Sequence, residues 1–217
     1  YDGKITLRRA VEKSKNVVAW KIFEDITPTV GLSYLKKMDF AKIDKNDYYP
    51  AASLGGFTYG ANAVEMASGF AAIVNDGVYR EPTCIINMTD TSGQELVSDH
   101  INLVPVYEEN AARTMTNILT GVLKYGTGRG LALNNMSCAG KTGTTNDKKD
   151  GWFVGYTPYY TTSVWVGYDI PKTVSNLYGS TYPGYIWKQF MNTIHEGLEY
   201  KQFKGYISNE KPKEEET

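Results

Sequence analysis

The spacing of apolar residues predicts that the first part of the chain is helical. ITLRRAVEKSKNVVAWKIFEDI predicts a helix that breaks at residues 14–16 and then resumes, with Leu7, Ala10 and Val11 on one face. VGLSYLKKMDF, which follows Pro28, predicts a short helix ended by polar turn residues, and PAASLGGFTYG predicts a glycine-rich loop. We therefore expect a group of short helices at this end.

Two longer helices are predicted further along. Asn62 is placed to cap the helix NAVEMASGFAAIVNDG, Glu65 occupies the capping-box position, and Gly77 follows as a stop signal. The small residues of this helix predict close packing in the core: Ala67, Gly69, Ala71 and Ala72. EENAARTMTNILTGVLKYG predicts an amphipathic helix that ends at Gly126. Its apolar face has helical spacing: Met115, Ile118, Leu119, Val122 and Leu123.

Strands follow these helices. PTCIINMTDTSGQELV predicts a hairpin around a DTSG turn. Strands are also predicted at residues 137–145, 152–156 and 163–168, and YIWKQFMNTIHEGL predicts a closing helix. Because the links between these strands are short, an antiparallel sheet is favoured. The pattern predicts an α+β fold over residues 1–203, followed by a charged tail or linker at 204–217.

The composition is that of a globular protein. The 217 residues carry a net charge of −1, which argues against a nucleic-acid partner or a membrane surface. No apolar run reaches about 18 residues, so we expect no transmembrane helix within this stretch. The chain opens with neither a signal peptide nor an initiator methionine, which predicts that it is a segment of a larger protein.

The cysteines, histidines and clustered glycines suggest structural roles. Cys84, Cys138, His100 and His195 lack the spacing of a metal site, so we expect two lone buried thiols and two structural histidines. The glycines in GTGRG lack the strand-before, helix-after context of a phosphate loop, and we expect a helix stop and a turn there. The aromatic residues after position 151 predict core and sheet surface, with Trp152 a candidate wall of a cleft.

One predicted strand carries an unusual polar group, Lys141-Thr142-Gly143-Thr144. Glycine weakens a strand interior, so it usually marks a bulge or a close approach by another chain. The lysine and the two hydroxyls suit a carboxylate, and Gly143 would let a substrate lie along the strand edge. The Thr144 N–H is a candidate donor to an oxyanion. The alternative interpretation is a surface edge strand protected by its lysine.

A second polar group lies at the predicted helix break, Ser14-Lys15-Asn16. The serine hydroxyl can pass a proton, and the asparagine amide can hold a carbonyl. An ordinary polar turn is the alternative interpretation of these three residues.

The two groups together match a known arrangement: Ser-x-Asn, then about 125 residues, then Lys-Thr-Gly. SLGGFTYGANAVEMASGFAAIVNDGVY, GTGRGLAL and KTGTTNDKKDGWFVGYTP extend the match over most of residues 7–198. The chain resembles the transpeptidase domain of class A, bifunctional penicillin-binding proteins. That resemblance implies the α+β fold shared with β-lactamases, in which helices flank an antiparallel sheet beside a mostly helical subdomain. This chain would be only the C-terminal part of that domain.

The resemblance also implies a serine D,D-transpeptidase that acts on D-Ala-D-Ala stem peptides and is inhibited by β-lactams. Ser14 would relay a proton, Asn16 would hold the substrate amide and orient the nucleophile's lysine, and Lys141 would keep the potential positive and bond to Ser14. Thr142 and Thr144 would bind the terminal carboxylate, and the Thr144 N–H would supply half of the oxyanion hole. No cofactor and no metal are implied.

The nucleophile of that family is the serine of a Ser-x-x-Lys motif that precedes Ser-x-Asn. Ser33 with Lys36 and Ser208 with Lys211 fit the string, but both follow Ser14 and are in the wrong order. We therefore expect no nucleophile in this chain. It would lie on an N-terminal segment of the same protein, either in one polypeptide with these residues or as a separate chain, and this chain alone would be inert.

The resemblance implies a larger protein at the extracytoplasmic face of the bacterial membrane. Its N-terminal transmembrane anchor and its glycosyltransferase domain would lie outside these residues. Three alternatives stay open: a β-lactamase, a non-enzymatic β-lactam sensor, and a structural relic without activity.

Overall fold

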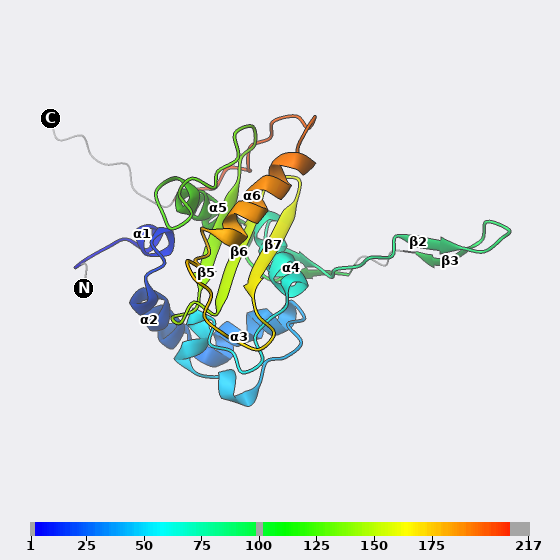
Figure 1. The fold of residues 1–217 in the computed structure, drawn as a ribbon. Helices are drawn as coiled ribbons and strands as arrows, with labels where there is room; N and C mark the ends of the chain where they lie inside the picture. Colours follow the sequence, from blue (N-terminus) through cyan, green and yellow to red (C-terminus); the bar gives the residue numbers. More distant parts are fainter. Residues whose placement is uncertain (1–2, 99–101, 209–217) are drawn as a thin grey trace.

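The computed structural model describes residues 3–98 and 102–208 (Figure 1). The helices are α1 (Leu7–Glu12), α2 (Asn16–Ile26), α3 (Pro28–Lys37), α4 (Ala63–Val74), α5 (Glu109–Lys124) and α6 (Tyr182–Ile194), with short 3₁₀ helices at Lys45–Asp47 and Pro50–Leu54. The strands are β1 (Val78–Arg80), β2 (Asn87–Thr89), β3 (Glu95–Ser98), β4 (Leu103–Pro105), β5 (Ala139–Thr144), β6 (Asp150–Tyr156) and β7 (Thr161–Gly167). The break predicted at residues 14–16 is confirmed, because α1 ends at Glu12 and α2 begins at Asn16.

The central sheet is antiparallel, in the order β5–β6–β7, as the short links predicted. Residues three apart on a strand point to opposite faces of the sheet. Phe153 and Tyr156 of β6 therefore belong to two different hydrophobic cores, one on each face. Phe153 packs with Trp187 and Met191 of α6. Tyr156 packs on the other face with residues of α4 and α5. The fold is therefore three layers, with α6 on one face of the sheet and α4 and α5 on the other (Figure 1).

The predicted capping box of α4 is confirmed. The Glu65 N–H donates to the Asn62 side chain at 2.9 Å, and the Asn62 N–H donates to the Glu65 carboxylate at 2.8 Å. Gly77 has a φ of +86° and donates its N–H to the Ala72 carbonyl, which ends the helix as predicted. Ala72 is buried, and a Cβ at Gly69 would lie 3.2 Å from the Phe40 ring, so the small residues do allow close packing.

The apolar face predicted for α5 is shifted at one position. Leu119, Val122 and Leu123 are buried, but Met115 is exposed, and Thr116 faces the core instead. Thr116 is accommodated because its hydroxyl accepts a hydrogen bond from the Tyr156 hydroxyl at 3.1 Å. A buried polar pair on two elements cannot be anticipated from helical periodicity alone.

Two further predictions need correction. PAASL forms a 3₁₀ helix, whereas the sequence predicted only loop, since Pro50 starts the turn and Gly55 ends it with a φ of +88°. Cys138 is buried as expected, but Cys84 is exposed. Cys84 belongs to the segment between β1 and β2, and this segment leaves the body of the domain (Figure 1). The β2–β3 hairpin itself is confirmed and projects away from the three layers (Figure 1).

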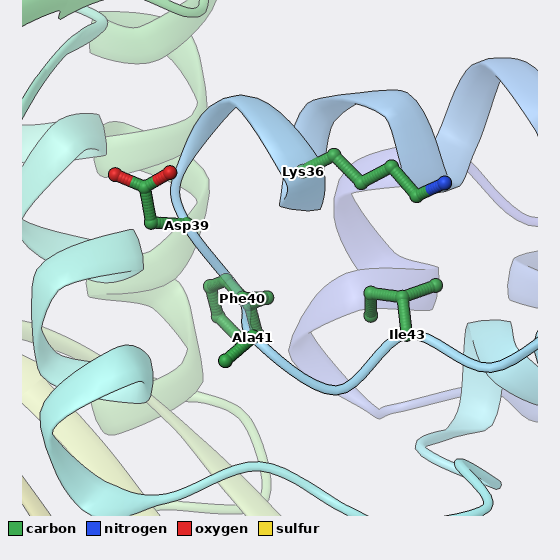
Figure 2. Close-up of a pocket in the computed structure, with 5 residues that line it drawn as sticks. All are labelled: Lys36, Asp39, Phe40, Ala41 and Ile43. Atoms are coloured by element: carbon green, nitrogen blue, oxygen red, sulfur yellow. The ribbon is translucent and has the colours of Figure 1, made fainter.

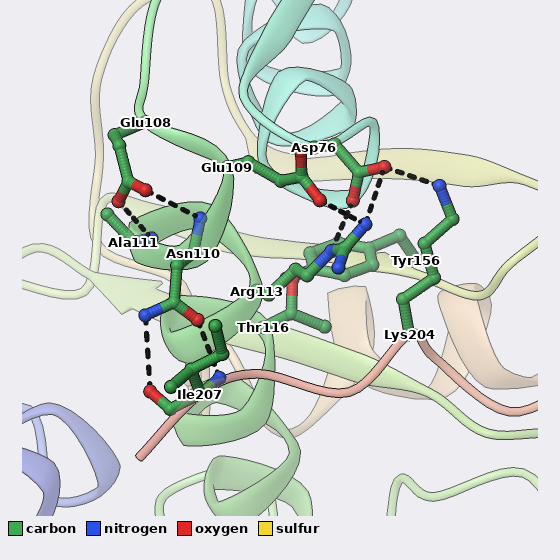
Figure 3. Close-up of polar contacts among 10 residues, drawn as sticks. All are labelled: Asp76, Glu108, Glu109, Asn110, Ala111, Arg113, Thr116, Tyr156, Lys204 and Ile207. Atoms are coloured by element: carbon green, nitrogen blue, oxygen red, sulfur yellow. Dashed lines mark hydrogen bonds and ion pairs between the residues drawn. The ribbon is translucent and has the colours of Figure 1, made fainter. Parts of the chain in front are cut away.

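The segment after α6 returns to the body of the domain and packs on α5. Phe203 lies edge-on to Tyr156, with ring centroids 5.6 Å apart. The Lys204 ammonium pairs with Asp76, which also accepts a hydrogen bond from Arg113 at 2.9 Å (Figure 3). The Ile207 N–H donates to the Asn110 side chain at 2.7 Å. The boundary at residue 203 stays a prediction, and residues 209–217 of the predicted tail lie outside the described residues.

Candidate active site

The Lys141 ammonium is the centre of the candidate site. It donates a hydrogen bond to Ser14 Oγ at 2.8 Å and a second to the Thr142 carbonyl at 2.9 Å. Burial lowers the pKa of Lys141 from 10.5 to about 8. The fold therefore brings together Ser14 and Lys141, which are 127 positions apart in the sequence.

Ser14 lies on a tight turn between α1 and α2. Its φ is +52°, and the turn is held by N–H bonds from Ser14 to Val11 and from Lys15 to Ala10, at 3.1 and 2.9 Å. Asn16 begins α2 on the same turn and is exposed, which leaves its amide accessible to an incoming group.

The end of α1 is fixed against the end of α5. The Thr127 N–H donates to the Glu12 carbonyl at 3.1 Å. A Cβ at Gly126 would lie only 2.2 Å from the same carbonyl oxygen, so only glycine permits this approach. This contact fixes the turn that carries Ser14 relative to the sheet that carries Lys141.

β5 presents an open edge at Lys141–Thr144. Among residues 3–98 and 102–208, β5 pairs with β6 alone. The Thr145 N–H donates to the Asp150 carbonyl on the β6 side at 3.1 Å. Because successive N–H groups along a strand point to opposite edges, the Thr144 N–H points to the open edge. That is the position in which it can serve an oxyanion.

The threonine hydroxyls beside this edge are already partly bonded. The Thr144 hydroxyl accepts the Gly179 N–H at 2.9 Å, which leaves its own hydrogen free to donate. The Thr142 hydroxyl lies 2.6 Å from the hydroxyl of Thr127, in the turn after α5. Sequence reasoning missed Thr127, because GTGRG was interpreted only as a helix stop and turn. The one signal in the sequence that could have identified Thr127 was a hydroxyl residue placed between Gly126 and Gly128.

Gly143 lies on the open edge of β5 and also allows close packing against neighbouring residues. A Cβ at Gly143 would lie 3.1 Å from Trp152 Cβ, which is tighter than ordinary contact. A Cβ at Gly179 would lie 2.8 Å from the Gly143 backbone and 2.5 Å from the Trp152 carbonyl oxygen. Trp152 is half-buried beside Gly143 and packs on Trp165, with ring centroids 6.4 Å apart. Its role as a cleft wall stays a prediction.

These contacts place one cation, two threonine hydroxyls and one N–H on β5 beside its open edge. A carboxylate needs donors and positive charge, and a tetrahedral oxyanion needs a preorganised N–H. The arrangement can hold both groups of an acyl substrate.

The family model of the penicillin binding protein transpeptidase domain matches residues 1–192. This chain belongs to that family. Penicillin-binding protein 1A of Clostridium botulinum (strain Hall) is 36% identical over 205 residues, which cover 93% of this chain and 24% of that protein. Penicillin-binding protein 4 of Bacillus subtilis is 34% identical over 186 residues, which cover 86% and 30%.

Solved structures agree on the fold. The penicillin-binding protein PonA1 of Mycobacterium tuberculosis, in complex with penicillin V, matches with a TM-score of 0.81 and 24% identity, covering 94% of this chain and 60% of that one. Penicillin-binding protein 1A of Haemophilus influenzae matches with a TM-score of 0.78 and 21% identity, covering 94% and 36%. The predicted family and α+β transpeptidase fold are confirmed. The chain spans between about a quarter and a third of the length of the curated relatives named above.

The Ser-x-x-Lys match on α3, Ser33 and Lys36, does not form a serine–lysine pair, because each side chain contacts another group. The Ser33 hydroxyl donates to the Val30 carbonyl at 2.8 Å. The Lys36 ammonium lies over the Tyr48 ring, 5.2 Å from its centroid. In the second match, Lys211 lies outside the described residues.

Two hollows lie elsewhere on the domain. One of about 400 Å³ is lined by Lys36, Asp39, Phe40, Ala41 and Ile43. Figure 2 shows the Lys36 and Asp39 side chains extending in opposite directions, so they do not converge on one ligand. The other, about 430 Å³, includes His195. The structural role expected for His195 stays a prediction, and its ring bonds to the Thr157 hydroxyl and the Met191 carbonyl at 2.8 and 2.6 Å. His100 lies outside the described residues.

Within residues 3–98 and 102–208, no three His, Cys, Asp or Glu side chains lie close enough together to hold a metal ion. No helix in the same residues is long and apolar enough to cross a membrane.

Proposed function

We propose that this chain is part of a D,D-transpeptidase that cross-links peptidoglycan by acyl transfer from D-Ala-D-Ala stem peptides. The hydrogen bond from Lys141 to Ser14, beside the open edge of β5, is the observation that carries the proposal. The family supports this proposal, because its model describes a transpeptidase domain and the relatives are called penicillin-binding proteins.

The nucleophile of the proposed reaction lies outside these 217 residues, on the serine of a Ser-x-x-Lys segment. As that serine attacks the carbonyl carbon of the penultimate D-alanine, its proton passes to the lysine of its own motif, and the carbonyl oxygen becomes an oxyanion that accepts a hydrogen bond from the Thr144 N–H. The C–N bond then breaks, the Ser14 hydroxyl passes its proton to the leaving amine of D-alanine, and the protonated lysine returns a proton to Ser14. An amine of a neighbouring peptidoglycan strand then attacks the acyl group, the bond to the serine breaks, and the proton lost by the amine returns to the serine oxygen.

The remaining groups hold the substrate. The hydroxyls of Thr142 and Thr144 bind the terminal carboxylate, and the Lys141 charge attracts it. Asn16 holds the substrate amide and orients the lysine of the nucleophile's motif. The absence of a side chain at Gly143 lets the peptide backbone lie along β5. A β-lactam presents its own carboxylate to the same groups and acylates the same serine.

We also place the intact protein at the extracytoplasmic face of the bacterial membrane, held by an N-terminal helix outside this chain. The length of the relatives leaves room for that anchor and for a glycosyltransferase domain. On this proposal the chain by itself has no transpeptidase activity, because the nucleophile is supplied by the rest of the protein.

Labelling of the full-length protein with a fluorescent penicillin tests the proposal. A stable covalent adduct together with cross-linking of stem peptides is the expected result. Rapid turnover of the label would identify a β-lactamase, and a stable adduct without cross-linking would identify a sensor. If no label bound at all, the transpeptidase, the β-lactamase and the sensor would all be excluded, and a structural role would remain.

A further inference from the structure

A third hydroxyl adjoins the two threonines of β5. Thr127 Oγ1 lies 2.6 Å from Thr142 Oγ1, a distance typical of a short hydroxyl–hydroxyl hydrogen bond. Thr127 is exposed and comes from the turn after α5, fifteen positions before Thr142. The contact therefore joins a separate element of the fold to the strand that carries the candidate carboxylate donors.

The hydrogen-bond capacity of these hydroxyls shows what the contact achieves. A hydroxyl has one hydrogen and two lone pairs, so one threonine of the pair donates to the other and one hydrogen stays free. The Thr144 hydroxyl accepts the Gly179 N–H, so its hydrogen is free as well. The three threonines thus offer two free O–H donors, which matches the two oxygens of a carboxylate.

The backbone of Thr127 is held in place before any ligand arrives. Its N–H donates to the Glu12 carbonyl at 3.1 Å, and the flanking Gly126 and Gly128 both donate N–H bonds to the Val122 carbonyl at 3.1 Å. Because the turn is already ordered, the Thr127 hydroxyl costs little conformational entropy to position. Its partner Thr142 is equally restrained within a paired strand.

We infer that Thr127 is a specificity-determining residue, which directs the Thr142 hydroxyl and completes the donor set for the terminal carboxylate of the substrate. This inference rests on the proposed function. In this inference Thr127 donates to Thr142 and leaves the Thr142 hydrogen for the carboxylate, so Thr127 acts through Thr142 and is a positioning residue. The expected consequence is a preference for ligands with a free carboxylate, without a direct role in the bond-breaking step.

Acylation of the full-length protein by two probes tests the inference. The probes are a fluorescent penicillin and its methyl ester, which lacks the carboxylate charge. In Thr127→Val, which keeps the side-chain shape without the hydroxyl, acylation by the free acid should slow by about tenfold, because one hydrogen bond to a charged group is weakened. Acylation by the ester should change less than about twofold. The loss should appear in the binding constant for the free acid and leave the limiting acylation rate unchanged.

Three control variants separate positioning from structural damage. Thr127→Ser keeps the hydroxyl and should restore the preference for the free acid. Thr120→Val removes an α5 hydroxyl that donates to the Asn117 carbonyl, and it should leave both rates unchanged. Thr127→Val should have no further effect in a Thr142→Val background, because the two hydroxyls act as one unit. This double variant remains informative if the single variant loses stability.

The outcomes distinguish this inference from the proposed function. A wild-type protein that reacts with neither probe overturns both. A wild-type protein that prefers the free acid, with the same preference in Thr127→Val, overturns the inference alone. Equal slowing of both probes in Thr127→Val would also overturn it, since that pattern reports general damage to the site.

Discussion

The Lys141 ammonium donates a hydrogen bond to the Ser14 hydroxyl at 2.8 Å, across 127 positions of sequence. One partner lies on the edge strand of the sheet and the other on the turn between two helices, so the contact exists only in the folded domain. It joins a cation that burial holds at a lowered pKa to the hydroxyl proposed to relay a proton.

Replacing Ser14 should remove that relay. In the full-length protein, Ser14→Ala should lower the rate of stem-peptide cross-linking by about 10²- to 10⁴-fold, because general acid catalysis is lost. The change should leave the melting temperature near that of the wild type, since Ser14 is exposed. The control is Ser33→Ala, whose hydroxyl donates only to a carbonyl of its own helix. Equal activity in the two variants would contradict the role given to Ser14.

The titration of Lys141 should limit activity at alkaline pH. The pKa of Lys141 is lowered to about 8 by burial, so the ammonium loses its charge as the pH rises through that value. Acylation by a penicillin with a free carboxylate should therefore decline above about pH 8, measured between pH 6.5 and 9.5. Lys141→Arg should react more slowly but without this decline, because a guanidinium stays charged. An identical decline in the arginine variant would show that another group titrates.

The same burial should reduce the stability of the fold at neutral pH. The folded pKa of Lys141 lies below the unfolded value of 10.5, so the unfolded chain binds more protons between about pH 8 and 10.5. The stability of the wild type should rise with pH across that window. At pH 7, Lys141→Met should be more stable by about 1–3 kcal/mol in urea unfolding, and the difference should narrow at pH 10.

A matched surface lysine provides the control for this measurement. Lys149 pairs with Asp147 at 3.0 Å on the exposed turn before β6. Lys149→Met should change stability by less than about 0.5 kcal/mol at either pH. A loss of stability in Lys141→Met at pH 7 would mean that its two hydrogen bonds outweigh the burial of the charge.

Gly179 should tolerate no side chain. A Cβ there would lie 2.5 Å from the Trp152 carbonyl oxygen and 2.8 Å from the Gly143 backbone, and neither atom can move without shifting β5 or β6. Gly179→Ala should cost about 1–3 kcal/mol of stability and displace the donors on β5. Penicillin acylation of the full-length protein should slow by at least about tenfold. Gly205→Ala, at a position with open space around its Cα, should match the wild type in both measurements.

The ion pairs of Asp76 should stabilise the fold except in strong acid. Hydrogen bonding from Arg113, together with the Lys204 charge, holds the pKa of Asp76 below its usual 3.8. This stability is present above about pH 4 and is lost as the pH falls through the lowered pKa. Asp76→Asn keeps a residue suited to its φ of +54° and should cost about 1–3 kcal/mol at pH 6.

The pH dependence distinguishes this contribution from a general packing effect. The difference between Asp76→Asn and the wild type, measured by urea unfolding, should shrink as the pH is lowered toward 2. Asp147→Asn removes an exposed partner of Lys149 and should change stability by less than about 1 kcal/mol. A constant difference for Asp76→Asn from pH 6 to pH 2 would exclude the ion pairs as its cause.

Local signals in the sequence were sufficient for most of the elements. The capping box of Asn62 and Glu65 and the stop at Gly77 depend on residues within one or two helical turns, so the sequence determined α4. The antiparallel order of β5, β6 and β7 followed from the short links between them. The Lys-Thr-Gly strand was recognised as a candidate site by its residue types, and its pairing with Ser14 was expected only through the family resemblance.

The tertiary structure decided the contacts between residues far apart in the sequence. Periodicity predicted Met115 in the core, but the hydroxyl of Tyr156 on another element makes Thr116 the buried residue. Thr127 lay in a glycine-rich turn, and only the packing of α5 beside β5 brings its hydroxyl to Thr142. Helix caps and strand order are determined by interactions between near neighbours, which sequence patterns record. The direction of each donor at the open edge of β5 depends on which elements meet there, and only the folded chain determines that.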